Sequence, residues 1–436
     1  MPRRLRLLTL LLALAAPAAA QEDFTTLKGH GGPVMGIAVA PSGQVASASF
    51  DNSVGLWTGR SPLWLEGHDA AVVDLTFVDD TTLASGGDDF TVRLWRKGTA
   101  EGTVLGRHKG KVTDLAVSPD GRTLASASWD GSVGLWPLAD KTAPRMLDQQ
   151  HGGVNDVAFS PDGIRLFAAT AFGDLVAYDL TTSLPPRKLA AHGFGINEMI
   201  VAPDGRWIAY GTVDGTTRVI DAATGAPLRQ FAVERKPVLA MAFHPGTNSI
   251  AVGYGDGYII TLDTAGPPEK WRIAKGFQAM REGPVWALAY APDGGVIWAG
   301  GLDNVVYGWP VSLLGAFEPV AGASDKSFLR KAGTMPNGER QFMRKCSICH
   351  SLTDDASRKA GPSLHGLFGR PAGTLPGYRY SPTLSGSDIV WNDATIDALF
   401  DIGPDHYIPD SKMPMQRITR AEDRADLIEF LKRETQ

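Results

Sequence analysis

Both cysteines of this 436-residue chain stand in one short segment, which reads QFMRKCSICHSL. They are Cys346 and Cys349, two residues apart, and His350 follows the second directly. Cys-x-x-Cys-His is the pattern for covalent attachment of a c-type haem. The spacing suits that chemistry because both thiols must reach the vinyl groups of one porphyrin while the adjacent imidazole reaches the iron. The motif therefore predicts one covalent haem c, attached at the cysteines, with His350 as an iron ligand.

Paired cysteines also serve other chemistries. An exported protein commonly joins them in a disulfide. A thioredoxin-like redox pair belongs near a βαβ pattern, which the surrounding sequence lacks. A zinc site needs two further thiolate or imidazole ligands at suitable spacing, and the chain has no other cysteine. The haem interpretation is favoured because the spacing, the adjacent histidine and the signs of export agree.

The N-terminus carries those signs of export. It begins with MPRRLR, continues with an apolar run from Leu7 to Ala16 and ends in small residues before Gln21. This is the order of a cleavable secretory signal, and we assign it to residues 1–20. An uncleaved anchor is the alternative, but the apolar run is shorter than the ~20 residues that span a bilayer. We expect a periplasmic protein with no transmembrane segment in the mature chain.

The region after the signal repeats itself. Seven similar motifs end at Trp57, Trp95, Trp136, Tyr178, Ile220, Leu262 and Trp309. The steps between them are 38, 41, 42, 42, 42 and 47 residues. A period of ~40–45 residues is typical of β-propeller blades. The segment FTTLKGH has no blade in front of it, and the last unit lacks an outer strand, so Phe24–Leu27 is predicted to complete the seventh blade. The fold prediction is an all-β, seven-bladed propeller over residues 21–311.

A finer pattern inside each unit gives a family resemblance. Aspartates lie six residues before six of the landmarks, at Asp51, Asp89, Asp130, Asp214, Asp256 and Asp303. Histidines open five units, at His30, His68, His108, His151 and His192, and serines precede the first three aspartates, at Ser47, Ser85 and Ser126. These residues resemble the WD40-repeat family, which implies a buried His, Ser, Asp and Trp hydrogen-bond network within each blade. The fourth unit departs from the pattern because Phe172 replaces its aspartate.

Beyond the propeller, the sequence predicts a linker over residues 312–331 and an all-α domain over residues 332–436. Asn337–Lys345 is expected to form a helix capped by its asparagine. Residues 419–434, TRAEDRADLIEFLKRE, are expected to form another, with a threonine cap, early acids and late bases.

Residues 337–436 resemble a class I, mitochondrial-type cytochrome c along nearly their whole length. CSICH is followed by KAGPSLHGLFGRPAGTLPGYRYS, by VWNDATID and by YIPDSKMPM, in the family's order. The resemblance implies that Met413 is the second axial ligand, and a methionine opposite a histidine suits an electron carrier. Met415 is the rival, and it could reach the iron only if its loop shifted.

The resemblance also implies roles around the haem. Pro362 matches the proline whose carbonyl accepts the free N–H of the haem histidine. Three further residues match positions that hydrogen-bond the haem propionates: Arg370, Tyr380 and Trp391. The contact between the first and last helices is implied by matches at Gly338, Phe342, Leu427 and Phe430.

Charge and histidine content limit the function. Lys and Arg number 42 against 47 Asp and Glu, so the chain lacks the basic footprint of a nucleic-acid binder. Of nine histidines, only His244 is left after the blade openings and the C-terminal domain are counted, so a second haem or metal in the propeller would lack an evident ligand set. We predict a non-enzymatic electron carrier. The alternatives are a redox enzyme whose propeller holds a second cofactor, resembling a nitrite reductase or a quinoprotein, and a non-redox sensor with a haem switch.

The propeller is expected to dock redox partner proteins. Large aromatic residues stand at the turns beside the blade aspartates, at Phe50, Trp129 and Phe172. Aromatic side chains are enriched at binding hot spots. The alternative is that each ring packs on its neighbouring blade.

Overall fold

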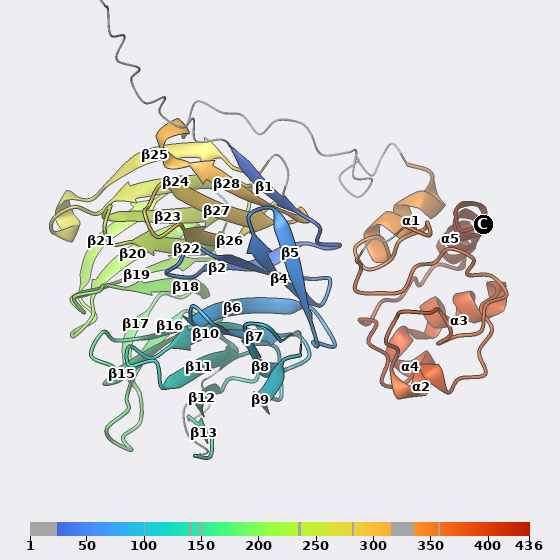
Figure 1. The fold of residues 1–436 in the computed structure, drawn as a ribbon, viewed down its shortest axis with the longest axis horizontal. Helices are drawn as coiled ribbons and strands as arrows, with labels where there is room; N and C mark the ends of the chain where they lie inside the picture. The colour runs from blue at the N-terminus through green and yellow to red at the C-terminus, as the bar shows by residue number, and fades with distance from the viewer. Residues whose placement is uncertain are drawn as a thin grey trace, which may run out of the picture.

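The computed structural model of the chain describes residues 24–99, 101–138, 142–147, 150, 152–233, 237–280, 283–314, 335–355 and 358–436. The predicted signal peptide, the predicted linker from residue 315 onward and His151 lie outside the described residues. The described residues form a strand-rich N-terminal body and a helical C-terminal body, which lie side by side (Figure 1).

The N-terminal body consists of seven four-stranded antiparallel sheets. The first sheet contains β2 (Val34–Val39), β3 (Val45–Ser49), β4 (Ser53–Thr58) and β5 (Ser61–Glu66). The second contains β6 (Val72–Asp79), β7 (Thr82–Gly87), β8 (Thr91–Arg96) and β9 (Thr103–Arg107). The third contains β10 (Val112–Val117), β11 (Thr123–Ser128), β12 (Val133–Pro137) and β13 (Arg145–Met146). The fourth contains β14 (Val154–Phe159), β15 (Arg165–Thr170), β16 (Asp174–Asp179) and β17 (Arg187–Ala191).

The remaining three sheets close the ring. The fifth contains β18 (Ile196–Val201), β19 (Trp207–Thr212), β20 (Thr216–Asp221) and β21 (Pro227–Ala232). The sixth contains β22 (Val238–His244), β23 (Ser249–Tyr254), β24 (Tyr258–Asp263) and β25 (Arg272–Gln278), with the short 3-10 helix η1 (Pro268–Lys270). The seventh contains β26 (Val285–Tyr290), β27 (Val296–Gly301), β28 (Val305–Pro310) and β1 (Thr25–Lys28), and η2 (Val311–Leu313) follows it.

The seventh sheet joins the two ends of the propeller sequence. β1 pairs antiparallel with β28, from Thr25 opposite Gly308 to Lys28 opposite Val305. The first strand of each sheet lies against the first strand of the next, and β26 lies against β2. This confirms that the N-terminal strand completes the seventh blade. Closure protects the sheet edges that an open ring would expose.

Buried polar networks fix the first three blades. The two ring nitrogens of His30 lie 2.9 Å from Asp51 Oδ2 and 2.8 Å from Ser47 Oγ, and Trp57 Nε1 donates to the same Ser47 Oγ at 2.8 Å. Equivalent contacts form around His68 and His108 in the next two blades. The implied network is therefore present where the sequence pattern is complete.

A second set of polar contacts joins consecutive blades. Asp74 accepts the backbone N–H of Leu115 at 2.9 Å, and Asp114 accepts that of Val157 at 2.8 Å. Asp156 accepts the next one, from Met199, at 2.6 Å. Each carboxylate thus ties the inner strand of its blade to the following inner strand.

Helices form the C-terminal body: α1 (Asn337–Lys345), α2 (Pro382–Ser385), α3 (Asp393–Ile402), α4 (Pro404–Tyr407) and α5 (Ala421–Glu434). None of the described helices is long and apolar enough to cross a membrane.

The expected helix caps are wrong in both long terminal helices. Asn337 is the first residue of α1, and its side chain donates to Asp423 Oδ1 at 2.7 Å and to Asp426 Oδ2 at 2.6 Å. It therefore links α1 to α5 and does not cap its own helix. α5 begins at Ala421, after Arg420 and not after the predicted threonine, and neither helix start has a side-chain cap.

The first and last helices cross closely, as the resemblance implies. A Cβ on Gly338 would lie 2.1 Å from the Asp426 carbonyl oxygen, so only glycine permits this approach. The rings of Phe342 and Phe430 lie 5.5 Å apart between centroids, and Leu427 is fully buried beside them. This crossing supports the segment that follows α1.

Candidate haem-binding site

The cysteine motif forms a tight turn at the end of α1. Cys346 donates its backbone N–H to Phe342 O at 2.8 Å, and both Cys349 and His350 donate theirs to Cys346 O, at 3.0 and 2.9 Å. The side chains of all three motif residues line one cavity of about 310 Å³. The turn thus brings the two cysteines and the histidine of the motif to the same side of the cavity.

The imidazole of His350 is held on two sides. Its Nδ1 lies 2.8 Å from the Pro362 carbonyl oxygen, as the resemblance implies. A carbonyl only accepts, so Nδ1 carries the proton and Nε2 keeps its lone pair for a metal. The ring also rests on Gly361, where a Cβ would lie 2.4 Å from His350 Cε1. Burial lowers the pKa of His350, which favours the neutral form that coordinates metals.

The structure separates the two candidate methionines. Met413 lines the cavity and packs against the helical core, and its backbone N–H donates to Ser411 Oγ at 3.1 Å. Met415 does not line the cavity and is 52% exposed, with its sulfur beside Gly403. Of these two methionines, Met413 shares the cavity with His350 and Met415 does not.

The two thiols are neutral groups in the apolar wall. Burial raises the pKa of Cys349 to about 11, and burial likewise raises that of Cys346. Neither side chain forms a disulfide. Both sulfurs are therefore available for bonds to a porphyrin.

Polar side chains line another part of the cavity. Arg370 donates to the carbonyl oxygens of His365 and Ser363, both at 2.8 Å, and its own carbonyl accepts the Trp391 N–H at 3.0 Å. Tyr380 lines the same cavity. The three residues that the resemblance assigns to the propionates are thus together.

Tyr378 is a cavity residue that the sequence did not single out. Its hydroxyl donates to the Ala360 carbonyl at 2.7 Å, and its ring contacts Tyr380 edge-on at 4.8 Å between centroids. The hydrogen bond therefore links the segment that contains Tyr378 and Tyr380 to the segment that leads to Pro362.

Apolar residues form most of the remaining wall: Leu364, Leu367, Leu384, Ile396, Leu399, Phe400, Ile408 and Leu431. A mainly apolar cavity with two thiols, one imidazole, one thioether and a cationic edge suits a flat porphyrin with acidic side chains. The residues present therefore fit a haem c.

The mouth of the cavity is lined by the propeller. Six residues from the first two blades face it: Phe50, Asn52, Asp69, Ala70, Ala71 and Asp88. Lys345 and Lys412 stand on the helical side. Sequence reasoning missed this surface because a contact between separate domains leaves no periodic signal.

Comparisons with known proteins agree with this geometry. The WD domain, G-beta repeat family matches residues 21–58, 60–96, 100–137, 144–174 and 184–221. The Cytochrome c family matches residues 336–434. The fold and the cavity define a seven-bladed propeller that is followed along the chain by an electron-transfer haem domain.

The C-terminal domain has close relatives. It is 41% identical to Cytochrome c of Sesamum indicum over 105 residues, which are 24% of this chain and 92% of that protein. Identity to Cytochrome c of Nigella damascena is 40% over 106 residues, 24% of this chain and 93% of that protein. Through this domain the chain belongs to the cytochrome c family, and its propeller is built of WD40 repeats. The cytochrome c domain implies covalently bound haem c.

Proposed function

We propose that this protein is a periplasmic one-electron carrier whose haem is attached at Cys346 and Cys349 and ligated by His350 and Met413. The observation that carries the proposal is the shared cavity of these four side chains. The N-terminal sequence supports the location because it has the order of an export signal.

The chain's own residues prepare the site for this role. The bound haem supplies reversible one-electron chemistry, and a methionine opposite a histidine raises its potential. Pro362 and Gly361 orient the imidazole, so little rearrangement accompanies a change of charge. The apolar wall keeps water away, and Arg370 offers a positive charge at the acidic edge.

An electron carrier is favoured over an enzyme because the candidate metal ligands leave no evident place for a substrate or a second cofactor among the described residues. Met413 would fill the coordination position that a substrate needs. In the propeller, both ring nitrogens of His244 are engaged, with Thr247 Oγ1 at 3.0 Å and with Pro292 O at 2.9 Å. Among the described residues, no group of three His, Cys, Asp or Glu side chains is placed to hold a metal.

The propeller's part in this function is to dock a redox partner. Its exposed aromatic side chains support this: Trp129 is 58% exposed, Phe172 68% and Phe194 57%. Phe50 faces the haem cavity and so does not belong to the free surface. We define the docking surface as Trp129, Phe172 and Phe194.

The test is purification of the exported protein with its cofactor. One iron per chain, all of it in haem that stays with the denatured polypeptide, and recovery from the periplasmic fraction are expected. A second metal or an extractable quinone at full occupancy would favour the enzyme alternative. Recovery in the cytoplasm would overturn the proposed location.

A further inference from the structure

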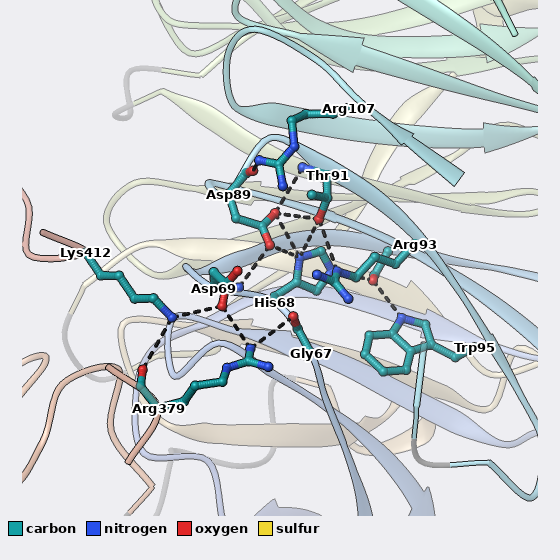
Figure 2. Close-up of polar contacts among 11 residues, drawn as sticks. Gly67, His68, Asp69, Asp89, Thr91, Arg93, Trp95, Arg107, Arg379 and Lys412 are labelled. Atoms are coloured by element: carbon teal, nitrogen blue, oxygen red, sulfur yellow. Dashed lines mark hydrogen bonds and ion pairs between the residues drawn. The ribbon is translucent and has the colours of Figure 1, made fainter. Parts of the chain in front are cut away.

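The propeller covers the opening of the haem cavity with an acidic segment. This segment, residues 66–69, runs from the end of β5 toward β6. Figure 2 shows Asp69 of this segment beside Arg379 and Lys412 of the cytochrome domain. Together the two acids of the segment, Glu66 and Asp69, meet three cations of that domain. Those cations, Arg358, Arg379 and Lys412, come from three separate loops around the cavity.

Asp69 is the centre of the contact. Its Oδ1 lies 2.8 Å from Lys412 Nζ and 2.9 Å from Arg379 Nη2, and Arg379 also donates to the Gly67 carbonyl at 3.3 Å. Burial acts to raise the pKa of Asp69, but the two cations hold it below its ordinary value. The carboxylate is therefore charged at neutral pH.

A second contact lies beside it. Arg358 pairs with Glu66, and its guanidinium lies over the Trp64 ring, 4.7 Å from the centroid. A cation on an aromatic face is favourable beyond the ion pair itself.

The buried blade network holds Asp69 in place. The backbone N–H of Asp69 donates to Asp89 Oδ2 at 2.9 Å, and the same carboxylate binds His68 Nδ1 at 3.0 Å (Figure 2). Because that histidine is part of the rigid framework, the acidic segment is fixed before the cytochrome domain arrives. Preorganised contacts lose less entropy on binding.

The cations belong to the haem site. Lys412 directly precedes the candidate ligand Met413, and Arg379 stands between Tyr378 and Tyr380, both of which line the cavity. A partner that reaches the cavity mouth must therefore approach these same cations.

We propose that the cytochrome domain docks on its own propeller through the face that carries the haem, with Asp69 and Glu66 in the place of an outside partner's acids. This inference rests on the proposed haem site. In the docked state the cavity mouth is closed to an outside redox partner. Docking and partner binding then compete for Arg379 and Lys412.

The contact is built to be reversible. Its ion pairs are partly exposed, and salt screens such pairs because the Debye length is about 10 Å at 0.1 M. Residues 315–334 join the two domains, and a chain of that length reaches up to about 70 Å when extended. Because the two domains belong to one chain, their effective concentration is high enough for weak pairs to act.

Carbodiimide coupling of the full-length haem protein tests the docking. This reagent joins a carboxylate directly to an amine, and we expect a cross-link between Asp69 and Lys412 in the monomeric fraction at low salt. Lys188 and Asp174, 2.6 Å apart within the propeller, provide the internal positive control. Absence of the 69–412 product while 174–188 forms would overturn the proposal. A 69–412 product found only in covalent dimers would overturn it as well, because the contact would then join two copies.

Variants that change the charge of the docking residues test whether docking closes the mouth of the haem cavity. Asp69→Asn and Arg379→Glu should each speed reduction of the haem by the uncharged reductant hydroquinone several-fold at low salt, and the swap Asp69→Arg with Arg379→Glu should restore the slow rate. Asp263→Asn is the matched control, because Asp263 pairs with Arg272 at the same 2.9 Å on the sixth blade. Equal rates in all variants would overturn closure of the cavity. A protein without haem would instead contradict the proposed function, and the cross-link reads out independently of haem.

Discussion

His350 and Pro362 are joined by a hydrogen bond of 2.8 Å from the imidazole Nδ1 to the backbone carbonyl oxygen. The bond sets the tautomer, and Gly361 lies directly against the imidazole ring. The ring is therefore oriented by the loop that follows the motif. The loop therefore helps to set the geometry of the site.

Gly361→Ala tests this orientation. The added Cβ would lie 2.4 Å from His350 Cε1, so the ring or the loop must shift. Overpacking of this kind costs about 1–3 kcal/mol, and we expect that loss of stability together with a shifted haem absorption spectrum. Gly386→Ala is the control, because its nearest neighbour would be 3.5 Å away. Equal spectra and equal stability for the two variants would contradict the packing argument.

Met413→Ala should remove the weak sulfur-to-iron absorption band of the oxidised protein and lower its reduction potential. The reason is loss of the thioether that favours reduced iron. Met415→Ala should leave both properties unchanged, because Met415 is exposed outside the cavity. The reverse pattern would show that Met415 is the ligand.

Much of the fold was predictable because its determinants repeat. The landmark at Trp57 recurs in the following blades, and the His30 network forms as its motif implies. The N-terminal strand at Thr25 was predictable by counting strands. Each of these signals is local or periodic in sequence.

Other features were missed for a physical reason. The sequence predicts Asn337 as a helix cap, but its side chain reaches α5 almost ninety positions away, and sequence alone does not show that neighbour. Asp69 meets Lys412 across two domains, without any repeat to mark the pair. The carboxylates between blades did leave a signal, since Asp74 and Asp114 each stand two residues after the first valine of an inner strand.

Asp51→Asn should destabilise the propeller by roughly 1–3 kcal/mol at pH 7, the usual cost of leaving the partners of a buried hydrogen-bonding group unsatisfied. Burial alone would raise the pKa of Asp51, but hydrogen bonds and the charge of His30 bring it below its ordinary value. The stabilisation is therefore present above the unfolded pKa, about 3.9, and is lost as pH falls through the folded value. Chemical unfolding followed by circular dichroism measures it.

Asp263→Asn again serves as the control, because Asp263 is partly exposed and pairs at the surface. Its loss should cost about 0–1 kcal/mol. If Asp51→Asn proves no worse than this control, the buried network does not hold the blade.

Unlike Asp51→Asn, Asp114→Asn should stabilise the propeller at high pH. Burial raises the pKa of Asp114 to about 6, so the folded state holds its proton more tightly than the unfolded chain does. The contribution of Asp114 to the free energy of unfolding is therefore fully present below about pH 4 and is lost as the pH rises through 6. An asparagine keeps an oxygen to accept the Val157 N–H without the charge.

The free energy of unfolding of Asp114→Asn should therefore exceed that of the unmodified protein by on the order of 2 kcal/mol at pH 8 and by little at pH 4. The difference follows from the pKa of Asp114 in the folded and unfolded states. Unfolding midpoints at the two pH values measure this. A uniform loss at both would mean that the carboxylate is needed in its charged form.

The exposed aromatic side chains give the last prediction, which concerns partner docking. Trp129 donates its Nε1 hydrogen to Asn155 Oδ1 at 3.1 Å, and Lys111 lies 4.9 Å from its ring centroid, so one edge is anchored while the ring stays open to solvent. Phe172 lies over Gly152, where a Cβ would come within 2.4 Å of the ring. Both rings thus have fixed orientations and free faces, which is the arrangement of preformed hot-spot residues.

A Trp129→Ser, Phe172→Ser variant should keep its haem spectrum and change in stability by less than about 1 kcal/mol, because surface side chains contribute little to folding. Its electron transfer with the physiological partner should slow at least tenfold, the effect of losing about 1.4 kcal/mol of binding. Leu184→Ser is the control, since Leu184 is 72% exposed on the fourth blade and outside the docking surface. Unchanged transfer in the double variant would exclude these rings from docking, and a large loss of stability would show that they serve the fold.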